Sequence, residues 1–168
     1  MPIILNNIFM LPEKHYGFIQ SGVPIGMIIG AIIVKKIINK LKLNNLLSLN
    51  GTLMALEIIL LAIPLMGEIK SYNINYLSAY YFFIMMLIGI CISLVDIPFS
   101  YIMQTDIEEG YRGRVLSLTI SLVKTVVPIS YLASGLLLDN INPMIIVLLG
   151  GIAILIVSVS YYKFKIIE

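Results

Sequence analysis

The sequence has few charged residues and a single cysteine. Only 12% of its 168 residues are Asp, Glu, Lys or Arg, whereas about a quarter are charged in a typical soluble domain. Hydrophobic residues make up 60% of the chain, and the mean hydropathy is +1.01. This composition excludes an ordinary soluble protein and indicates a membrane protein. The single cysteine, Cys91, excludes an internal disulfide.

Residues that carry catalytic or metal-binding chemistry are also scarce. The only histidine, His15, lies in a polar stretch, so we expect it to be solvated. The sequence has no His, Cys or carboxylate cluster with metal-ligand spacing, no glycine-rich phosphate loop and no nucleophile elbow. An intramembrane enzyme would need paired catalytic groups, and the apolar runs and their edges offer only Glu57, Asp96 and Lys124. We predict no enzymatic activity, cofactor, metal or nucleic-acid partner.

The sequence does contain five apolar runs, each long enough to cross a bilayer as a helix of about 20 residues. The hydrocarbon core cannot satisfy open strand edges, so runs of this length must be helices. We predict an all-α, polytopic transmembrane helix bundle in the lipid bilayer, one unit over residues 1–168 with a short N-terminal helix remnant. The predicted helices cover about residues 15–35, 44–66, 76–103, 114–138 and 142–163.

Basic residues are distributed unevenly between the two ends of these helices. With alternating crossings, one end has eight Lys or Arg and the other has two. Cytoplasmic loops carry the excess of Lys and Arg, so we predict a multi-pass protein of the cell membrane with its N-terminus outside and its C-terminus in the cytoplasm. The eight are Lys35, Lys36, Lys40, Lys42, Arg112, Arg114, Lys163 and Lys165, and the two are Lys14 and Lys70.

Small residues line one side of the first predicted helix. Gly22, Gly26 and Gly30 recur every four residues, which leaves that side without side chains. A neighbouring backbone can therefore approach closely. The pattern predicts a helix-packing face, and sliding between the two helices is the alternative interpretation.

The third and fourth predicted helices each carry a polar stripe within about 80° of arc, at 100° per residue. A lipid-facing stripe is unfavourable, so we expect both to face the protein interior or a water-filled cavity. The first stripe contains Gly89, Ser93, Asp96, Ser100 and Gln104, and the second contains Ser117, Ser121, Lys124, Pro128, Tyr131 and Gly135.

Lys124 lies roughly 15 Å from the inner end of its predicted helix, near the middle of the bilayer. An ionisable residue at this depth indicates function, and the alternative is a structural ion pair with Asp96 or Glu57. For Glu57 we favour the structural interpretation, because no polar stripe accompanies it. The candidates for a substrate cavity or for ion coupling are Ser93, Asp96, Ser100, Ser121, Lys124 and Tyr131.

Residues 96–139, "DIPFSYIMQTDIEEGYRGRVLSLTISLVKTVVPISYLASGLLLD", resemble the segment from the tenth to the eleventh helix of major facilitator superfamily (MFS) exporters of the macrolide-efflux and enterobactin-exporter type. "HYGFIQSGVPIGMIIGAII" is similar to the eighth helix of that family. The loop after it lacks the family's frequent Gly-x-x-x-Asp-Arg-x-Gly-Arg pattern. The matching features are Pro98, Gln104, Glu108, Glu109, the "RGRV" of residues 112–115, Pro128 and Gly135.

The resemblance implies a C-terminal half of such a transporter, from the end of the seventh helix to the twelfth. The expected function is proton-coupled efflux of an amphipathic small-molecule substrate, with the N-terminal six-helix half missing. In this family the seventh, eighth, tenth and eleventh helices line the cavity, which would include both polar stripes. The alternative is a truncated, non-transporting membrane protein that pairs with another half.

Five charged residues gather in the predicted cytoplasmic loop, residues 104–114, between the two striped helices: Asp106, Glu108, Glu109, Arg112 and Arg114. Negative charge before a helix N-terminus is favoured by the helix dipole, and we expect the arginines to hold the loop in the cytoplasm and to pair with the acids. The cluster is interpreted either as a fixed topology anchor or as a latch that breaks when two halves change orientation.

Overall fold

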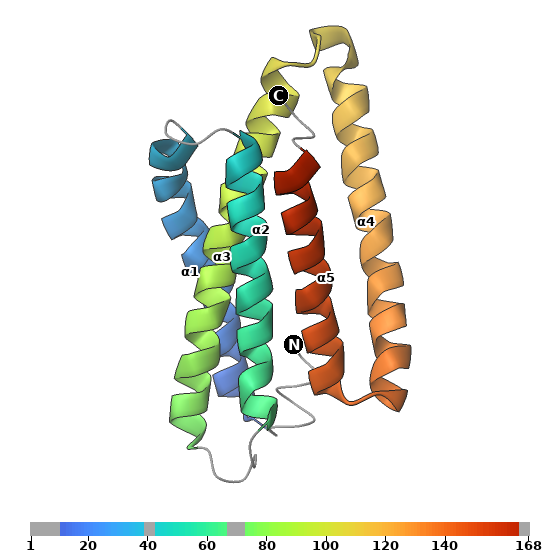
Figure 1. The fold of residues 1–168 in the computed structure, drawn as a ribbon. Helices are drawn as coiled ribbons and strands as arrows, with labels where there is room; N and C mark the ends of the chain where they lie inside the picture. Colours follow the sequence, from blue (N-terminus) through green and yellow to red (C-terminus); the bar gives the residue numbers. More distant parts are fainter. Residues whose placement is uncertain (1–10, 39–42, 67–72, 165–168) are drawn as a thin grey trace.

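The structure is a computed structural model that describes residues 11–38, 43–66 and 73–164. In these ranges every regular element is helical (Figure 1), and consecutive α-helices run in opposite directions. All five α-helices are long and apolar enough to cross a membrane. The prediction of an all-α, multi-pass membrane bundle is therefore confirmed. The elements are α1 (Glu13–Ile38), α2 (Leu43–Ala62), the 3-10 helix η2 (Ile63–Met66), α3 (Ile74–Thr105), α4 (Glu109–Asn140) and α5 (Pro143–Phe164).

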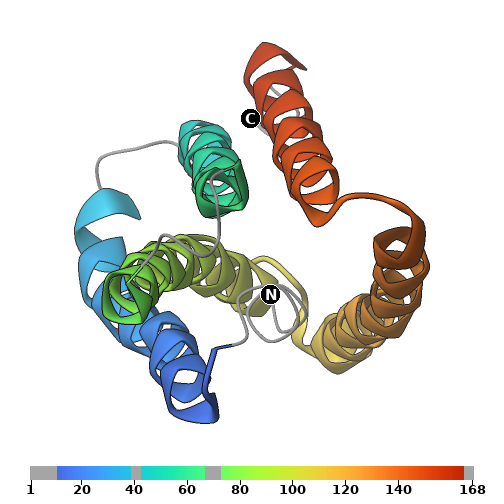
Figure 2. The ribbon, with the colours of Figure 1, turned by 90° about the horizontal axis from the view of Figure 1, so that it is seen from below.

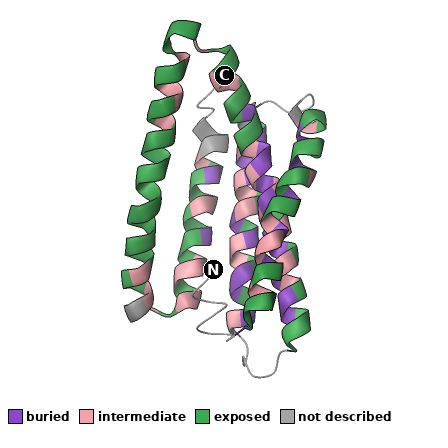
Figure 3. Cartoon of the chain, turned by 180° about the vertical axis from the view of Figure 1, so that it is seen from behind, coloured by how far each residue is buried: buried purple, intermediate pink, exposed green. Residues whose placement is uncertain are grey.

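Four of the helices pack in two pairs, and α4 stands apart from them. Helix α1 packs along α3, α2 packs along α5, and a contact between α2 and α3 joins the pairs. Viewed along the helices, α3, α2, α5 and α4 follow an open arc, with α1 crossing α3 (Figure 2). No residue in the apolar stretch of α4 is buried, and α4 is exposed along nearly all its length (Figure 3).

The best-packed part of the molecule is the contact of α1 with α3. Ile19 and Tyr81 are fully buried there, with Leu77, Ile84 and Met85 beside them. Within a bilayer this packing acts through van der Waals contact rather than through the hydrophobic effect, because lipid tails are as apolar as the side chains. Close fit between the two helix surfaces is therefore what stabilises the pair.

The expectation that His15 is solvated is wrong. Helix α1 begins at Glu13, two residues before His15, so the imidazole lies on the first turn of a packed helix. The side chain is half-buried, and its Nδ1 lies 2.9 Å from the Ser78 hydroxyl of α3. The histidine therefore links the N-terminal ends of α1 and α3.

Proline accounts for the change of helix type at the end of the second span. Pro64 has no backbone N–H to donate to Leu60, one turn earlier, and the α-helix gives way to η2 at Ile63. The Tyr80 hydroxyl of α3 donates to the Leu60 carbonyl at 2.7 Å. In a membrane a carbonyl without a partner in its own helix needs such a donor. The sequence predicted the extent of this span but not its change of helix type.

Two asparagines begin the helices at the same end of the bundle. Asn73 accepts a hydrogen bond from the backbone N–H of Asn75 at 3.0 Å, at the start of α3. Asn142 does the same for Met144 at the start of α5, where Pro143 occupies the first helical position. Side-chain acceptors of this kind satisfy helix N–H groups that have no partner within the helix.

The predicted N-terminal remnant lies mostly outside the described residues.

Candidate functional site

The glycine face of α1 lies directly on α3. A Cβ atom added to Gly22 would lie 2.6 Å from the Phe82 carbonyl oxygen, and one added to Gly30 would lie 2.9 Å from that of Ile90. At Gly26 an added Cβ would overlap the Met86 carbonyl oxygen. The sequence predicted a close helix contact for these three glycines, and the structure identifies α3 as the partner.

Part of the predicted stripe of α3 belongs to this contact. Gly89 packs against the backbone of α1 at Val23, and Ser93 is 3% exposed. The Ser93 hydroxyl donates to the Met27 carbonyl of α1 at 2.9 Å. Ser93 therefore joins two helices and is not exposed to a shared cavity.

Beyond Ser93 the stripe is open. Asp96 and Ser100 are exposed, and among the described residues neither side chain has a hydrogen-bond or ion-pair partner. Pro98, between them, is buried. The stripe is thus divided into a buried packing part and an exposed polar part toward the α3–α4 turn.

The predicted candidates on α4 are exposed. Ser121 and Lys124 are exposed, and Tyr131 is 73% exposed. In the part of the chain that the structure describes, the Lys124 side chain forms no ion pair, so neither Asp96 nor Glu57 is its partner. The structure therefore does not bring the α3 and α4 candidates together into one site.

The charge cluster between the two helices is mostly helical. Helix α4 begins at Glu109, five residues before the predicted start, so only Asp106 and Glu108 of the five charged residues lie in the turn. The expected pairing with the acids is also absent from the described residues, because Arg112 instead donates to the Ile107 carbonyl at 3.3 Å. A helix can extend beyond its apolar run because water solvates the charged side chains there. Hydropathy marks only the apolar run, so it does not predict this extension.

A polar cluster that the sequence did not predict lies buried between α2 and α3. Asn50, Glu57 and Cys91 are 2%, 7% and 3% exposed. The Asn50 side-chain amide donates to the Cys91 carbonyl at 2.9 Å, and the Cys91 thiol donates to Glu57 Oε1 at 3.3 Å. The seven-residue spacing of Asn50 and Glu57, two helical turns, was the signal available in the sequence.

No family model, curated protein or solved structure matches this chain. The multi-pass membrane architecture is therefore supported by the length and composition of the helices themselves. No group of three His, Cys, Asp or Glu gathers within the described residues, so the polar cluster offers no metal site of that kind.

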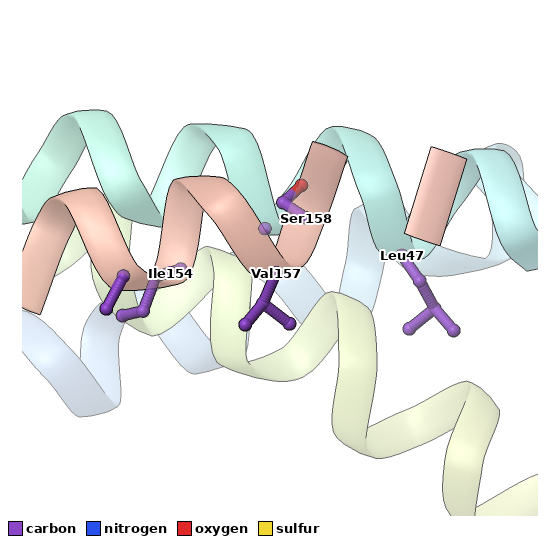
Figure 4. A pocket seen from close by; sticks show the side chains of 6 residues that line it. Leu47, Ile154, Val157 and Ser158 are labelled. Carbon is purple, nitrogen blue, oxygen red and sulfur yellow. The ribbon is translucent and has the colours of Figure 1, made fainter. Parts of the chain in front are cut away.

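A pocket of about 370 Å³ lies between α2 and α5 (Figure 4). Its one side-chain hydroxyl, from Ser158, already donates to the backbone carbonyl of Ser48. The Ser48 hydroxyl donates in return to the backbone carbonyl of Ser158 at 3.1 Å. The pocket therefore offers no free side-chain hydroxyl to orient a polar ligand. The lining residues are Leu47, Gly51, Ala153, Ile154, Val157 and Ser158.

Proposed function

We propose that this chain is the C-terminal half of a secondary transporter of the major facilitator superfamily, which exports an amphipathic small molecule in exchange for protons. The observation that carries the proposal is α4: a membrane-spanning helix with a polar stripe and no buried residue along its apolar stretch. Polar side chains on a spanning helix are unfavourable against lipid. Further helices would cover them, as an N-terminal six-helix half does in this family.

The exposed stripe supports a transport path better than it supports a purely structural role. Ser121, Lys124 and Tyr131 share a face of α4 that no other described helix covers. Placed against a second half, this face would line the boundary where the family binds its substrates. The alternative is a non-transporting membrane protein that pairs with another half, and the same exposed face supports it.

We assign the end of the bundle that carries the basic residues to the cytoplasm, with the cell membrane as the location. Lys35 and Lys36 lie in the last turn of α1, and Arg112 and Arg114 lie in the first turns of α4. The end of α1 and the start of α4 are at the same end of the molecule (Figure 1). The excess of Lys and Arg at this end supports the orientation. The start of α1 then lies on the outside, and the end of α5 lies in the cytoplasm.

Thiol labelling of intact cells checks this orientation. In a Cys91→Ser background, Lys36→Cys should resist a membrane-impermeant maleimide, whereas Asn75→Cys, at the other end of the bundle, should react. Both positions are exposed, so burial does not separate them. Labelling at position 36 with protection at position 75 would reverse the orientation.

Transport by purified protein tests the function. The chain alone in vesicles should show no saturable, gradient-driven uptake of an amphipathic fluorescent dye, because the polar face of α4 has no opposing wall. Co-reconstitution with a six-helix half encoded beside it should give such uptake, and dissipating the proton gradient should remove it. Uptake by the chain alone would contradict the proposal of a half transporter. Absence of uptake from the folded two-half complex would favour the non-transporting alternative.

A further inference from the structure

Glu57 is a carboxyl group buried in the middle of a membrane-spanning helix. It lies at the thirteenth position of the 21-residue span Asn45–Leu65, with 7% of its surface exposed. One of its oxygens, Oε1, accepts a hydrogen bond from the Cys91 thiol. The other, Oε2, is buried and has no hydrogen-bond partner among the described residues.

No cation faces this carboxyl from the helices packed on α2. Helix α5 has no charged residue between Pro143 and Ser160, and α3 has none between Ile74 and Val95. The titratable groups that α3 presents toward α2 are Cys91, Tyr80 and Tyr81. Tyr80 and Tyr81 donate to backbone carbonyls of α2 at Leu60 and Leu61. All of these groups are neutral when protonated, so none of them supplies a positive charge.

An ionised carboxylate in these surroundings is much less favourable than a neutral acid. Burying an unpaired charge costs far more than burying a polar group that lacks one hydrogen bond. In a membrane interior such a charge is kept only where it is paired or reaches water. The thiol of Cys91 gives Oε1 a donor but no countercharge.

We propose that Glu57 is a proton-binding site inside the membrane, in which Cys91 holds one carboxyl oxygen and Oε2 takes up the proton. The ligand is a proton, which adds to the carboxylate to give the neutral acid and is released to regenerate the carboxylate. Asn50 belongs to the same site, because its amide is fixed on the Cys91 carbonyl while its Oδ1 is a second buried acceptor without a partner in the described residues. Cys91 thus positions both polar residues of α2.

This assignment does not rest on the proposed export function. It concerns a group on α2, whereas the export proposal rests on the exposed face of α4. Spectroscopy of the chain alone in lipid measures the site without any transport assay. A negative efflux result therefore leaves the proton site intact, and a negative spectroscopic result leaves the export proposal intact.

Infrared spectroscopy of the purified chain in lipid at neutral pH tests the proposal. A protonated carboxyl has a carbonyl stretching band that a carboxylate lacks, so the wild-type chain should show the band and Glu57→Gln should lose it. A carbonyl that accepts a hydrogen bond vibrates at lower frequency than a free one. Cys91→Ala should therefore move the band to higher frequency, and Cys91→Ser, which keeps a donor, should leave it low.

Glu108→Gln is the matched control, because Glu108 is exposed in the turn between α3 and α4, outside the spanning helices, and the change should leave the band in place. The proposal is overturned if Glu57→Gln removes no protonated-carboxyl band, or if Cys91→Ala leaves the band frequency unchanged. If Glu57→Gln loses its helical circular dichroism, labelling of the wild-type chain decides instead. An apolar carbodiimide adds to a protonated carboxyl and ends as a stable N-acylurea. An adduct at Glu57 supports the proposal, and adducts at other carboxyls alone overturn it.

Discussion

Gly26→Val separates α1 from α3 and lowers the stability of the chain by about 3 kcal/mol or more, as expected for overpacking against atoms that cannot move aside. The added Cβ would overlap the Met86 carbonyl oxygen and lie 3.1 Å from the Cα of Gly89. Both are backbone atoms, so no side-chain rotation relieves the contact. Thermal unfolding in detergent, followed by circular dichroism, should show a melting temperature lower by roughly 6–12 °C for a chain of this size.

Gly17→Val is the matched control on the same helix. An added Cβ at Gly17 meets no heavy atom within 4 Å, and valine is a better helix former than glycine. The control should therefore leave the melting temperature unchanged or raise it slightly. Equal melting temperatures for the two variants would show that the glycine face of α1 does not pack on α3.

Lys124→Met abolishes gradient-driven export by the complex of the two proposed halves and leaves the stability of this chain within about 0.5 kcal/mol of the wild type. The expected stability follows from the exposed side chain of Lys124, which has no ion-pair partner among the described residues. The expected loss of export follows from its place on the polar face of α4, where a second half would exclude water. Dye efflux and thermal unfolding, measured on the same preparation, check both parts.

Lys124→Arg distinguishes proton coupling from simple attraction of an anionic substrate. Arginine keeps the positive charge but does not release its proton, so a coupling role predicts that this variant also fails to export. Lys36→Met, which removes a lysine at the end of α1, should export normally. Export by Lys124→Arg at the wild-type rate would contradict the coupling role, and export by Lys124→Met would exclude any role for the amine.

The sequence predicted the number and course of the helices, because runs of apolar residues of this length have no other fold in a bilayer. Helix ends were less predictable where water takes over from lipid. The charges of Arg112 and Arg114 predict a loop, although a helix that leaves the membrane carries charges readily. The charge and hydropathy of a segment indicate whether it lies in water or in lipid, but they do not show whether its backbone is helical.

The partners of individual side chains could not be predicted from the sequence. The spacing of Gly22, Gly26 and Gly30 indicated a close contact but did not say with which helix. The spacing of the α3 stripe predicts one polar surface, yet α1 covers Ser93 and leaves Asp96 exposed. The sequence does not reveal the partner of Glu57, because Cys91 lies 34 residues away on another helix. Each of these contacts depends on how the helices are arranged relative to one another. The periodicity of a single helix gives no information about that arrangement.

The attachment of α4 at its two ends determines how it can move. Three residues, Asp106 to Glu108, join it to α3, and two, Ile141 and Asn142, join it to α5. Turns this short fix the position of each end of the helix but allow the orientation of the helix to change. Because both of its ends are held, α4 must tilt, or rotate about its own axis, when α5 tilts relative to α3.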